Sequence, residues 1–237
     1  EQVTRYNMFI SAMINGQPAS GYTSGQAIEA IKQTAASTLP KGYGYDWAGA
    51  SRDQANSGNQ AIYIFIICLL FVYLLLAAQY ESFLLPLPVL LSLPIGIFGS
   101  LFMLMILGLE NNIYAQIAMI MLIGILGKNA ILIIEFATLK QKQGKTPFAA
   151  AVEGASVRLR PIIMTSFAFI AGLIPLMLAS GAGSIGNNTI GAAAAGGMLF
   201  GTVFGVIIIP GLYVAFASIA EKFNKGRKEE TVLKETM

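Results

Sequence analysis

Hydrophobic and polar positions divide the chain into a short mixed segment and a long apolar one. Residues 1–50 mix apolar and polar positions, residues 51–59 (SRDQANSGN) form a polar connector, and residues 60–219 consist mainly of long apolar runs. A run of about 20 apolar residues, at about 1.5 Å rise per residue, spans a bilayer core of about 30 Å. The pattern therefore predicts a membrane α-helical fold that a small soluble piece precedes.

The apolar segment predicts five transmembrane helices and a charged tail at residues 220–237. The predicted spans are residues 60–78, 84–108, 113–139, 160–180 and 189–217. Prolines within them are tolerated when neighbouring helices satisfy the freed carbonyl groups. Between the third and fourth spans, Thr146 and Pro147 predict the start of a short amphipathic helix, because threonine favours the N-cap and proline the first helical position.

The soluble segment, residues 1–50, reads as one β-α-β unit. Tyr6–Ile14 and Tyr43–Ala48 have the composition of strands, and a helix is predicted from Ser24 to Thr38, where Thr23 and Gln26 fit a capping box. A unit of this size rarely buries enough surface to fold alone. We therefore expect its partner to be another chain or sequence that is missing here.

Basic residues are distributed unequally between the connectors of the five spans. The segment 140–160 carries five Lys or Arg residues and the tail 220–237 carries five more, whereas connectors 109–112 and 181–188 carry none. Because cytoplasmic loops are enriched in Lys and Arg, both basic segments should be cytoplasmic. With five spans, residues 1–50 are then extracytoplasmic, which implies earlier membrane helices outside this sequence.

The composition narrows the possible chemistry. The chain is 55% hydrophobic and 11% charged, with one cysteine and no histidine. The lack of histidine excludes Ser-His-Asp and Cys-His catalysis and histidine-ligated metal sites. Cys68 has no second cysteine with which to form an intrachain disulfide. We expect no catalytic residues, metal or cofactor, and no nucleic-acid partner.

Two ionisable residues lie inside the third span. Lys128 sits just past its middle and Glu135 lies two turns further on. A charge at that depth costs at least about 2.5 kcal/mol, so it needs a partner or a water-filled cavity. Helical spacing puts Gly124, Lys128, Ile131 and Glu135 on one face, which must turn toward other helices. Glu135 lies about 10 Å from Lys128 along the axis, so the acid that pairs with Lys128 is expected outside this sequence.

Lys128 is either an ion-coupling or proton-relay residue or a structural cation that locks helices together. Arg158 and Thr165 share a face of the fourth span and, together with Lys128, suggest a polar path from the middle of the membrane to the cytoplasm. They can also be a snorkelling anchor and a helix–helix hydrogen bond. Asn129 and Glu135 either join the relay or orient Lys128. Three small residues at four-residue spacing predict close helix packing and no binding site: Gly197, Gly201 and Gly205.

The motifs around these residues resemble those of a known family. The stretches GKNAILIIEFA (127–137) and RLRPIIMTSFAFIAGLIPL (158–176) resemble the final helices of resistance–nodulation–division efflux pumps, and look most like the hydrophobe/amphiphile multidrug branch. Support comes from AAQYESFLLPLPVLLSLPIGIFG (77–99), GAGSIGNNTIG (181–191) and GYGYDWAGAS (42–51). The resemblance covers essentially the whole chain, in order.

The resemblance implies a drug/proton antiporter of the inner membrane that the proton motive force drives, and not an enzyme. Residues 1–50 would be the last part of a periplasmic porter subdomain, and the five spans would be transmembrane helices eight to twelve of twelve. In that family, the lysine that matches Lys128 pairs with two adjacent aspartates on helix four, and the positions that match Arg158 and Thr165 belong to the proton path. Such pumps are homotrimers, joined to a periplasmic adaptor and an outer-membrane channel, and export hydrophobic or amphiphilic drugs.

Two other functions remain open from the residues. The protein-export accessory branch of the same superfamily has similar spans, but should carry an intramembrane Asp or Arg in place of the GKN motif. A plain membrane anchor or scaffold would use Lys128 only to lock helices. The resemblance implies that the substrate pockets lie mainly in periplasmic parts outside these residues.

Overall fold

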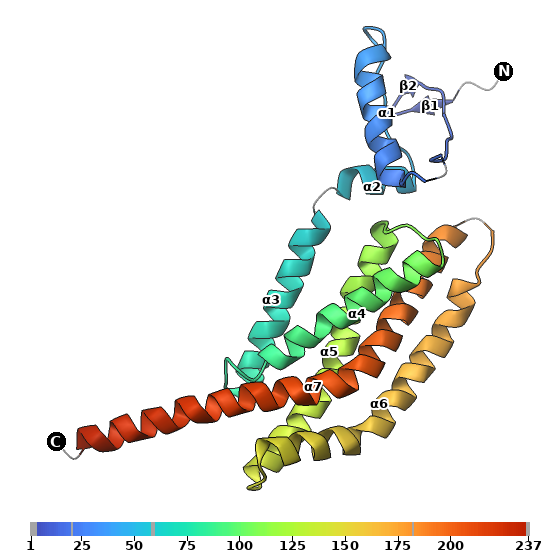
Figure 1. Cartoon of the computed structure of the whole chain (residues 1–237). Coiled ribbons are helices and arrows are strands. Elements are labelled where there is room, and N and C mark those ends of the chain that lie inside the picture. The colour runs from blue at the N-terminus through green and yellow to red at the C-terminus, as the bar shows by residue number, and fades with distance from the viewer. Residues whose placement is uncertain (1–3, 20, 58–59, 182, 236–237) are drawn as a thin grey trace. The chain divides into compact units, whose positions relative to one another are not determined.

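The computed structural model describes residues 4–19, 21–57, 60–181 and 183–235, with the side chains of the last helix described as far as Ile219. The chain divides into two compact units, Glu1–Gly58 and Asn59–Met237. The first unit contains two short strands and two helices, and the second consists of long helices (Figure 1). The basic residues of the predicted tail lie outside the described side chains.

The first unit begins with a tight hairpin of strands β1 (Arg5–Tyr6) and β2 (Phe9–Ile10), which pair antiparallel. Asn7 and Met8 form its turn with φ of 48° and 70°, the left-handed backbone that the commonest two-residue hairpin turn requires at both positions. The segment Tyr6–Ile14, predicted as one strand, therefore turns back on itself. After the hairpin come helices α1 (Ser24–Thr38) and α2 (Ala50–Ser57).

The predicted β-α-β order is wrong, because both strands of the first unit precede α1. The segment Tyr43–Ala48, predicted as the second strand, has no regular secondary structure. A strand needs a neighbour for its backbone groups, and β1 already pairs with β2. The other difference is in the connector 51–59, where the described residues belong to α2.

Helix α1 starts as its sequence predicts. The Thr23 hydroxyl accepts from the backbone N–H of Gln26, whose side chain accepts from the backbone N–H of Thr23, and these two bonds form the capping box. Ile28 of this helix is buried, but Ile31, three residues further on and on the same face, is 50% exposed. In the hairpin Met8 is 95% exposed. This unit therefore covers little of its own apolar surface.

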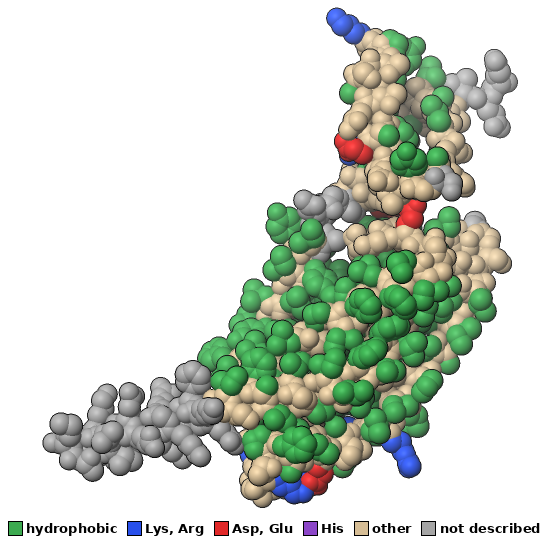
Figure 2. Space-filling view, in the orientation of Figure 1, with side chains coloured by type: hydrophobic (Ala, Val, Ile, Leu, Met, Phe, Trp, Pro, Cys, Tyr) green, Lys and Arg blue, Asp and Glu red, His purple; other side chains and the backbone are tan. Residues whose placement is uncertain are grey.

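The second unit is a bundle of five helices, each long and apolar enough to cross a membrane, which confirms the predicted fold class. They are α3 (Gln60–Tyr80), α4 (Leu87–Ile106), α5 (Ile113–Lys142), α6 (Pro147–Met177) and α7 (Ser184–Glu235). Figure 2 shows hydrophobic side chains over most of the visible face of this bundle, with charged side chains gathered near one end of it. That distribution is the one expected of helices in an apolar environment.

Helices α5 and α6 begin at side-chain caps. Asn112 accepts from the backbone N–H groups of Tyr114 and Ala115 at the start of α5. Thr146 caps α6 and Pro147 is its first residue, which confirms the predicted start. The amphipathic stretch and the fourth span form one continuous helix, however, where two were predicted. Figure 1 shows α6 bent, and proline inside a helix, here Pro161, is the usual cause of a bend.

Small residues let α7 pass through the middle of the bundle. A Cβ added to Gly196 would lie 2.7 Å from the carbonyl oxygen of Gly99, and one added to Gly99 would lie 2.8 Å from that of Gly196. The backbones of α4 and α7 therefore touch. The four residues before this crossing, Ala192–Ala195, are all buried. Helix α7 also packs against α5 and α6, so this stretch is enclosed by its neighbours.

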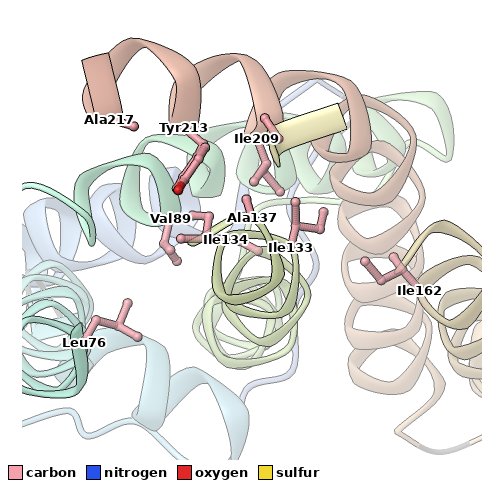
Figure 3. Close-up of a cluster of buried hydrophobic side chains, with 11 residues drawn as sticks. Leu76, Val89, Ile133, Ile134, Ala137, Ile162, Ile209, Tyr213 and Ala217 are labelled. Atoms are coloured by element: carbon pink, nitrogen blue, oxygen red, sulfur yellow. The ribbon is translucent and has the colours of Figure 1, made fainter. Parts of the chain in front are cut away.

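A larger cluster of apolar side chains joins all five helices (Figure 3). Leu76 of α3, Val89 of α4, Ile134 of α5, Ile162 of α6 and Tyr213 of α7 belong to it. The fully buried Tyr213 donates its hydroxyl to Oε1 of Gln141 at 2.5 Å, which ties α7 to the end of α5. This cluster and the α4–α7 crossing fix the rotation of α5 and hence the direction of its polar residues.

Candidate functional site

Helix α5 presents two different faces. Contacts with α3, α4, α6 and α7 cover one of them, and the described residues leave the other open. The exposed stripe follows helical spacing and consists of Ile117, Met121, Gly124, Lys128, Glu135 and Leu139. Between these positions lie the buried side chains that hold α5 in the bundle. Lys128 thus sits in the middle of an otherwise largely apolar stripe that is free to contact further helices.

Lys128 has no ion-pair partner among the residues that the structure describes. The two ion pairs found there both involve Glu153, near the start of α6. Glu135 lies on the same stripe as Lys128 but makes no ion pair with it. An ammonium on an apolar helix surface is stable only beside an acid or water, so this face calls for a polar partner.

Arg158 lies against the far part of α5. Its guanidinium carbon is 4.1 Å from the centroid of the Phe136 ring, a cation–π contact, and its Nε is buried without a hydrogen-bond partner in the described chain. Phe136 follows Lys128 by eight residues, or about 12 Å of helix. The structure therefore does not bring Arg158 and Lys128 together.

Thr165 is exposed on α6, and its hydroxyl donates to the carbonyl oxygen of Ile162 in its own helix at 3.0 Å. The next residue, Ser166, is buried and accepts a hydrogen bond of 2.8 Å from the Thr202 hydroxyl of α7. Sequence reasoning missed this interhelical bond. Helical spacing puts Ser166 on the same face as Ile162, but only the structure shows that this face is buried.

Asn129 points away from Lys128. It is buried on the covered face of α5, and its Nδ2 has no hydrogen-bond partner in the described part of the chain. Ser92 of α4 and Thr202 of α7 line the same small cavity as Asn129. Adjacent helical residues point about 100° apart, which explains how one of two neighbours faces outward and the other inward.

The three predicted packing glycines differ in their surroundings. A Cβ on Gly197 would lie 2.2 Å from Cδ1 of Leu122, and one on Gly201 would lie 2.5 Å from Cδ2 of Leu126. At Gly205 the nearest atom would be 3.4 Å away, in ordinary contact. Gly197 and Gly201 thus allow α5 side chains to approach the backbone of α7, whereas no α5 side chain lies that close to Gly205 among the described residues.

The basic end of the α5–α6 hairpin is fixed by ion pairs. Glu153 of α6 pairs with Nζ of Lys140 at 2.8 Å and also with Lys145 in the turn. The searched residues contain no group of three or more acidic, Cys or His side chains placed to hold a metal ion.

These features define a multi-pass membrane protein whose intramembrane cation lies on an open helix face. The model of the AcrB/AcrD/AcrF family matches residues 1–217, so the chain belongs to this family of the resistance–nodulation–division group. It is 42% identical over 225 residues to the multidrug resistance protein MdtF of Escherichia coli K12, an alignment that covers 94% of this chain and 22% of MdtF.

Other relatives are equally similar. The toluene efflux pump membrane transporter TtgB of Pseudomonas putida is 42% identical over 92% of this chain and 21% of its own length. The multidrug export protein AcrF of Escherichia coli K12 is 42% identical over 90% of this chain and 21% of its own. These relatives are efflux transporters rather than enzymes. The chain spans about one-fifth of the length of the curated relatives it matches.

Proposed function

We propose that this chain forms the C-terminal membrane part of a multidrug exporter of the inner membrane that couples drug export to proton entry. The observation that carries the proposal is Lys128, a cation on an apolar, uncovered stripe of α5 with no ion-pair partner among the described residues. Membership of a family whose relatives are named as efflux pumps supports it. It is a secondary transporter and needs no cofactor.

In this mechanism Lys128 reports the protonation of an acidic pair on a helix that this sequence does not contain. When both acids are ionised, they hold the ammonium of Lys128. Protonation removes the charge of the acids, so their contact with Lys128 weakens. Helix α5 then moves relative to the helix that carries the acids, and the porter domain responds. Arg158 and Thr165 serve the proton route toward the cytoplasm, and Glu135, on the same stripe as Lys128, is a further member.

The same proposal assigns topology and partners. Residues 1–50 belong to a periplasmic porter subdomain, the five helices are the eighth to twelfth of twelve, and the tail 220–237 is cytoplasmic. The complete protein is a homotrimer that works with a periplasmic adaptor and an outer-membrane channel on hydrophobic or amphiphilic drugs. The exposed apolar side chains of the first unit suit a piece that the remainder of such a subdomain covers.

The central test replaces Lys128 in the complete protein. Lys128→Met keeps the length and apolar packing of the side chain but removes its charge, so the stranded acids take up protons and the pump stays in one state. We expect near-normal membrane abundance and loss of efflux of a fluorescent drug. Lys128→Arg should also be impaired, because a planar guanidinium does not replace a compact ammonium.

Lys142→Met is the matched control, because Lys142 lies on the same helix but in its basic last turn. It should leave efflux per pump molecule unchanged. Substantial efflux by Lys128→Met at equal abundance would contradict the relay. A variant that loses both its abundance and its efflux would show that Lys128 is a structural cation.

Orientation is tested at the two ends of α5. Single cysteines replace the exposed Asn111 and Gln143 in a Cys68→Ser background of the complete protein. An impermeant thiol reagent outside the inner membrane should label Asn111→Cys and spare Gln143→Cys until the membrane is opened. The reverse pattern would show that the basic loop is periplasmic and that the assigned topology is inverted.

A further inference from the structure

A small polar cavity lies on the covered side of α5, away from Lys128. Ser92 of α4, Asn129 of α5 and Thr202 of α7 contribute its polar lining, and the rest is apolar. The cavity offers about 10 Å³ to the centre of a water molecule. That volume is at the lower limit for one water molecule and too small for a larger ligand.

The hydrogen bonds around the cavity leave a complementary set of groups. Asn129 is 9% exposed, and its Nδ2, a donor of two hydrogen bonds, has no partner among the described residues. The Ser92 hydroxyl donates to the carbonyl oxygen of Val89 at 2.7 Å, and the Thr202 hydroxyl donates to the hydroxyl oxygen of Ser166 at 2.8 Å. Both hydroxyl oxygens therefore keep lone pairs that can accept.

We propose that one ordered water molecule occupies this cavity and joins three helices. It accepts from Nδ2 of Asn129 and donates to the hydroxyl oxygens of Ser92 and Thr202, which gives it the three partners typical of a buried water. None of the described residues that line the cavity is charged. A neutral molecule that both accepts and donates is therefore the ligand that these groups suit.

The water gives Asn129 a role distinct from that of Lys128. Asn129 becomes a positioning residue that ties α5 to α4 and α7 through the water, and it is not a member of the proton route. The bound water also extends the direct bond between Thr202 and Ser166, so that α4, α5, α6 and α7 share one hydrogen-bond network. This inference goes beyond the proposed transport function and does not depend on it.

Radiolytic hydroxyl-radical labelling of the complete protein tests for the water, because radicals formed from a bound water oxidise the side chains beside it. Ile133 and Ile162 line the cavity and are 1% and 2% exposed, whereas Ile134 and Ile123 are 0% and 2% exposed and do not line it. We expect Ile133 and Ile162 to be labelled several-fold more than Ile134 and Ile123. Equal labelling of the two pairs would overturn the proposal.

Two variants sharpen this test. Asn129→Leu removes the donor and fills the cavity, and Thr202→Val removes a hydroxyl at nearly constant shape, so both should reduce labelling of Ile133 and Ile162 to that of Ile134. Unchanged labelling in a folded Asn129→Leu protein would also overturn the proposal. If a variant unfolds, Ile134 becomes labelled too, and the wild-type comparison decides. Active efflux in Lys128→Met would contradict the relay role proposed for Lys128 without altering these labelling patterns.

Discussion

Lys128 and Asn129 are adjacent in the sequence, yet they lie in opposite environments. Lys128 is on the stripe of α5 that the described chain leaves uncovered, and Asn129 is buried against α4 and α7. A polar residue on the uncovered stripe has its partner elsewhere, whereas one on the covered face must be satisfied within this bundle. Their adjacency in the sequence suggests one shared role for Lys128 and Asn129, but their positions on different faces of α5 favour different roles.

Helix α6 repeats the contrast. Thr165 is exposed and donates to a carbonyl oxygen of its own helix, while Ser166 bonds to Thr202 across the interface with α7. We assign the outward residue to transport and the inward one to assembly. On both helices, this rule predicts that substitution of an outward residue lowers efflux, whereas substitution of an inward residue lowers stability.

The largest expected effect comes from moving the charge to the covered face. Asn129→Lys buries an ammonium among apolar side chains and should cost about 3 kcal/mol or more, so little folded protein should remain in the membrane. Asn129→Ser, which keeps a small polar group, is the control. Abundance is measured by immunoblot and stability by thermal unfolding of the purified complete protein. Normal values for Asn129→Lys would mean that this face is open to water.

The next effect tests the close packing behind α5. Gly197→Ala places a Cβ against Leu122 and Ser100 and should destabilise the protein by about 1–3 kcal/mol through overpacking. Gly205→Ala, on the same helix, meets only ordinary contact and should change stability little. Thermal unfolding of the two variants side by side measures the difference. Equal midpoints would show that the crossing of α7 adapts to added volume.

Two substitutions on α6 should have smaller effects, one on stability alone and the other on efflux alone. Ser166→Ala removes a buried hydrogen bond and should cost about 1 kcal/mol of stability without lowering efflux per pump molecule. Thr165→Val should lower efflux and leave the unfolding midpoint unchanged. Thermal unfolding and efflux normalised to abundance provide the two readings. If both variants lose stability and keep efflux, Thr165 has no part in transport.

The smallest effect concerns Arg158. Replacing Phe136 by leucine removes the ring under the guanidinium and should cost about 0.5–1 kcal/mol. The pH dependence of efflux by the same variant shows whether the loss of this contact also affects the proton route proposed for Arg158. Phe136→Tyr, which keeps the ring, is the control. A stability loss of equal size in Phe136→Tyr would mean that packing, not the cation–π contact, is responsible.

Much of the fold follows from local signals in the sequence. The length of the apolar runs predicts five spanning helices, and Thr23, Thr146 and Pro147 mark helix starts that the structure contains. The errors arise where distant contacts decide the outcome. Tyr43–Ala48 resembles a strand but has no strand beside it, and the amphipathic stretch continues into the fourth span as α6, where a separate short helix was predicted.

The sequence predicts which polar residues of α5 belong together, but not which way their side chains point in the bundle. An intramembrane lysine stands out in any apolar helix, and helical spacing groups Lys128 with Gly124 and Glu135 on one face. Spacing does not show which face of α5 the bundle covers, because that depends on where Gly197 and Gly201 let α7 approach. The inward directions of Asn129 and Ser166 follow from that approach, and no local motif encodes them.

The enclosed stretch of α7 has a consequence for the entropy of the bundle. Alanine and glycine lose no side-chain rotamers on burial, so packing Ala192–Ala195 among the neighbouring helices and Gly196 against α4 incurs no rotameric cost. The same side chains have no alternative rotamers through which the interface could yield once it has formed. We therefore expect α4 and α7 to move as one rigid body, while the rotamer-rich side chains on the uncovered stripe of α5 adjust to whichever helix lies against them.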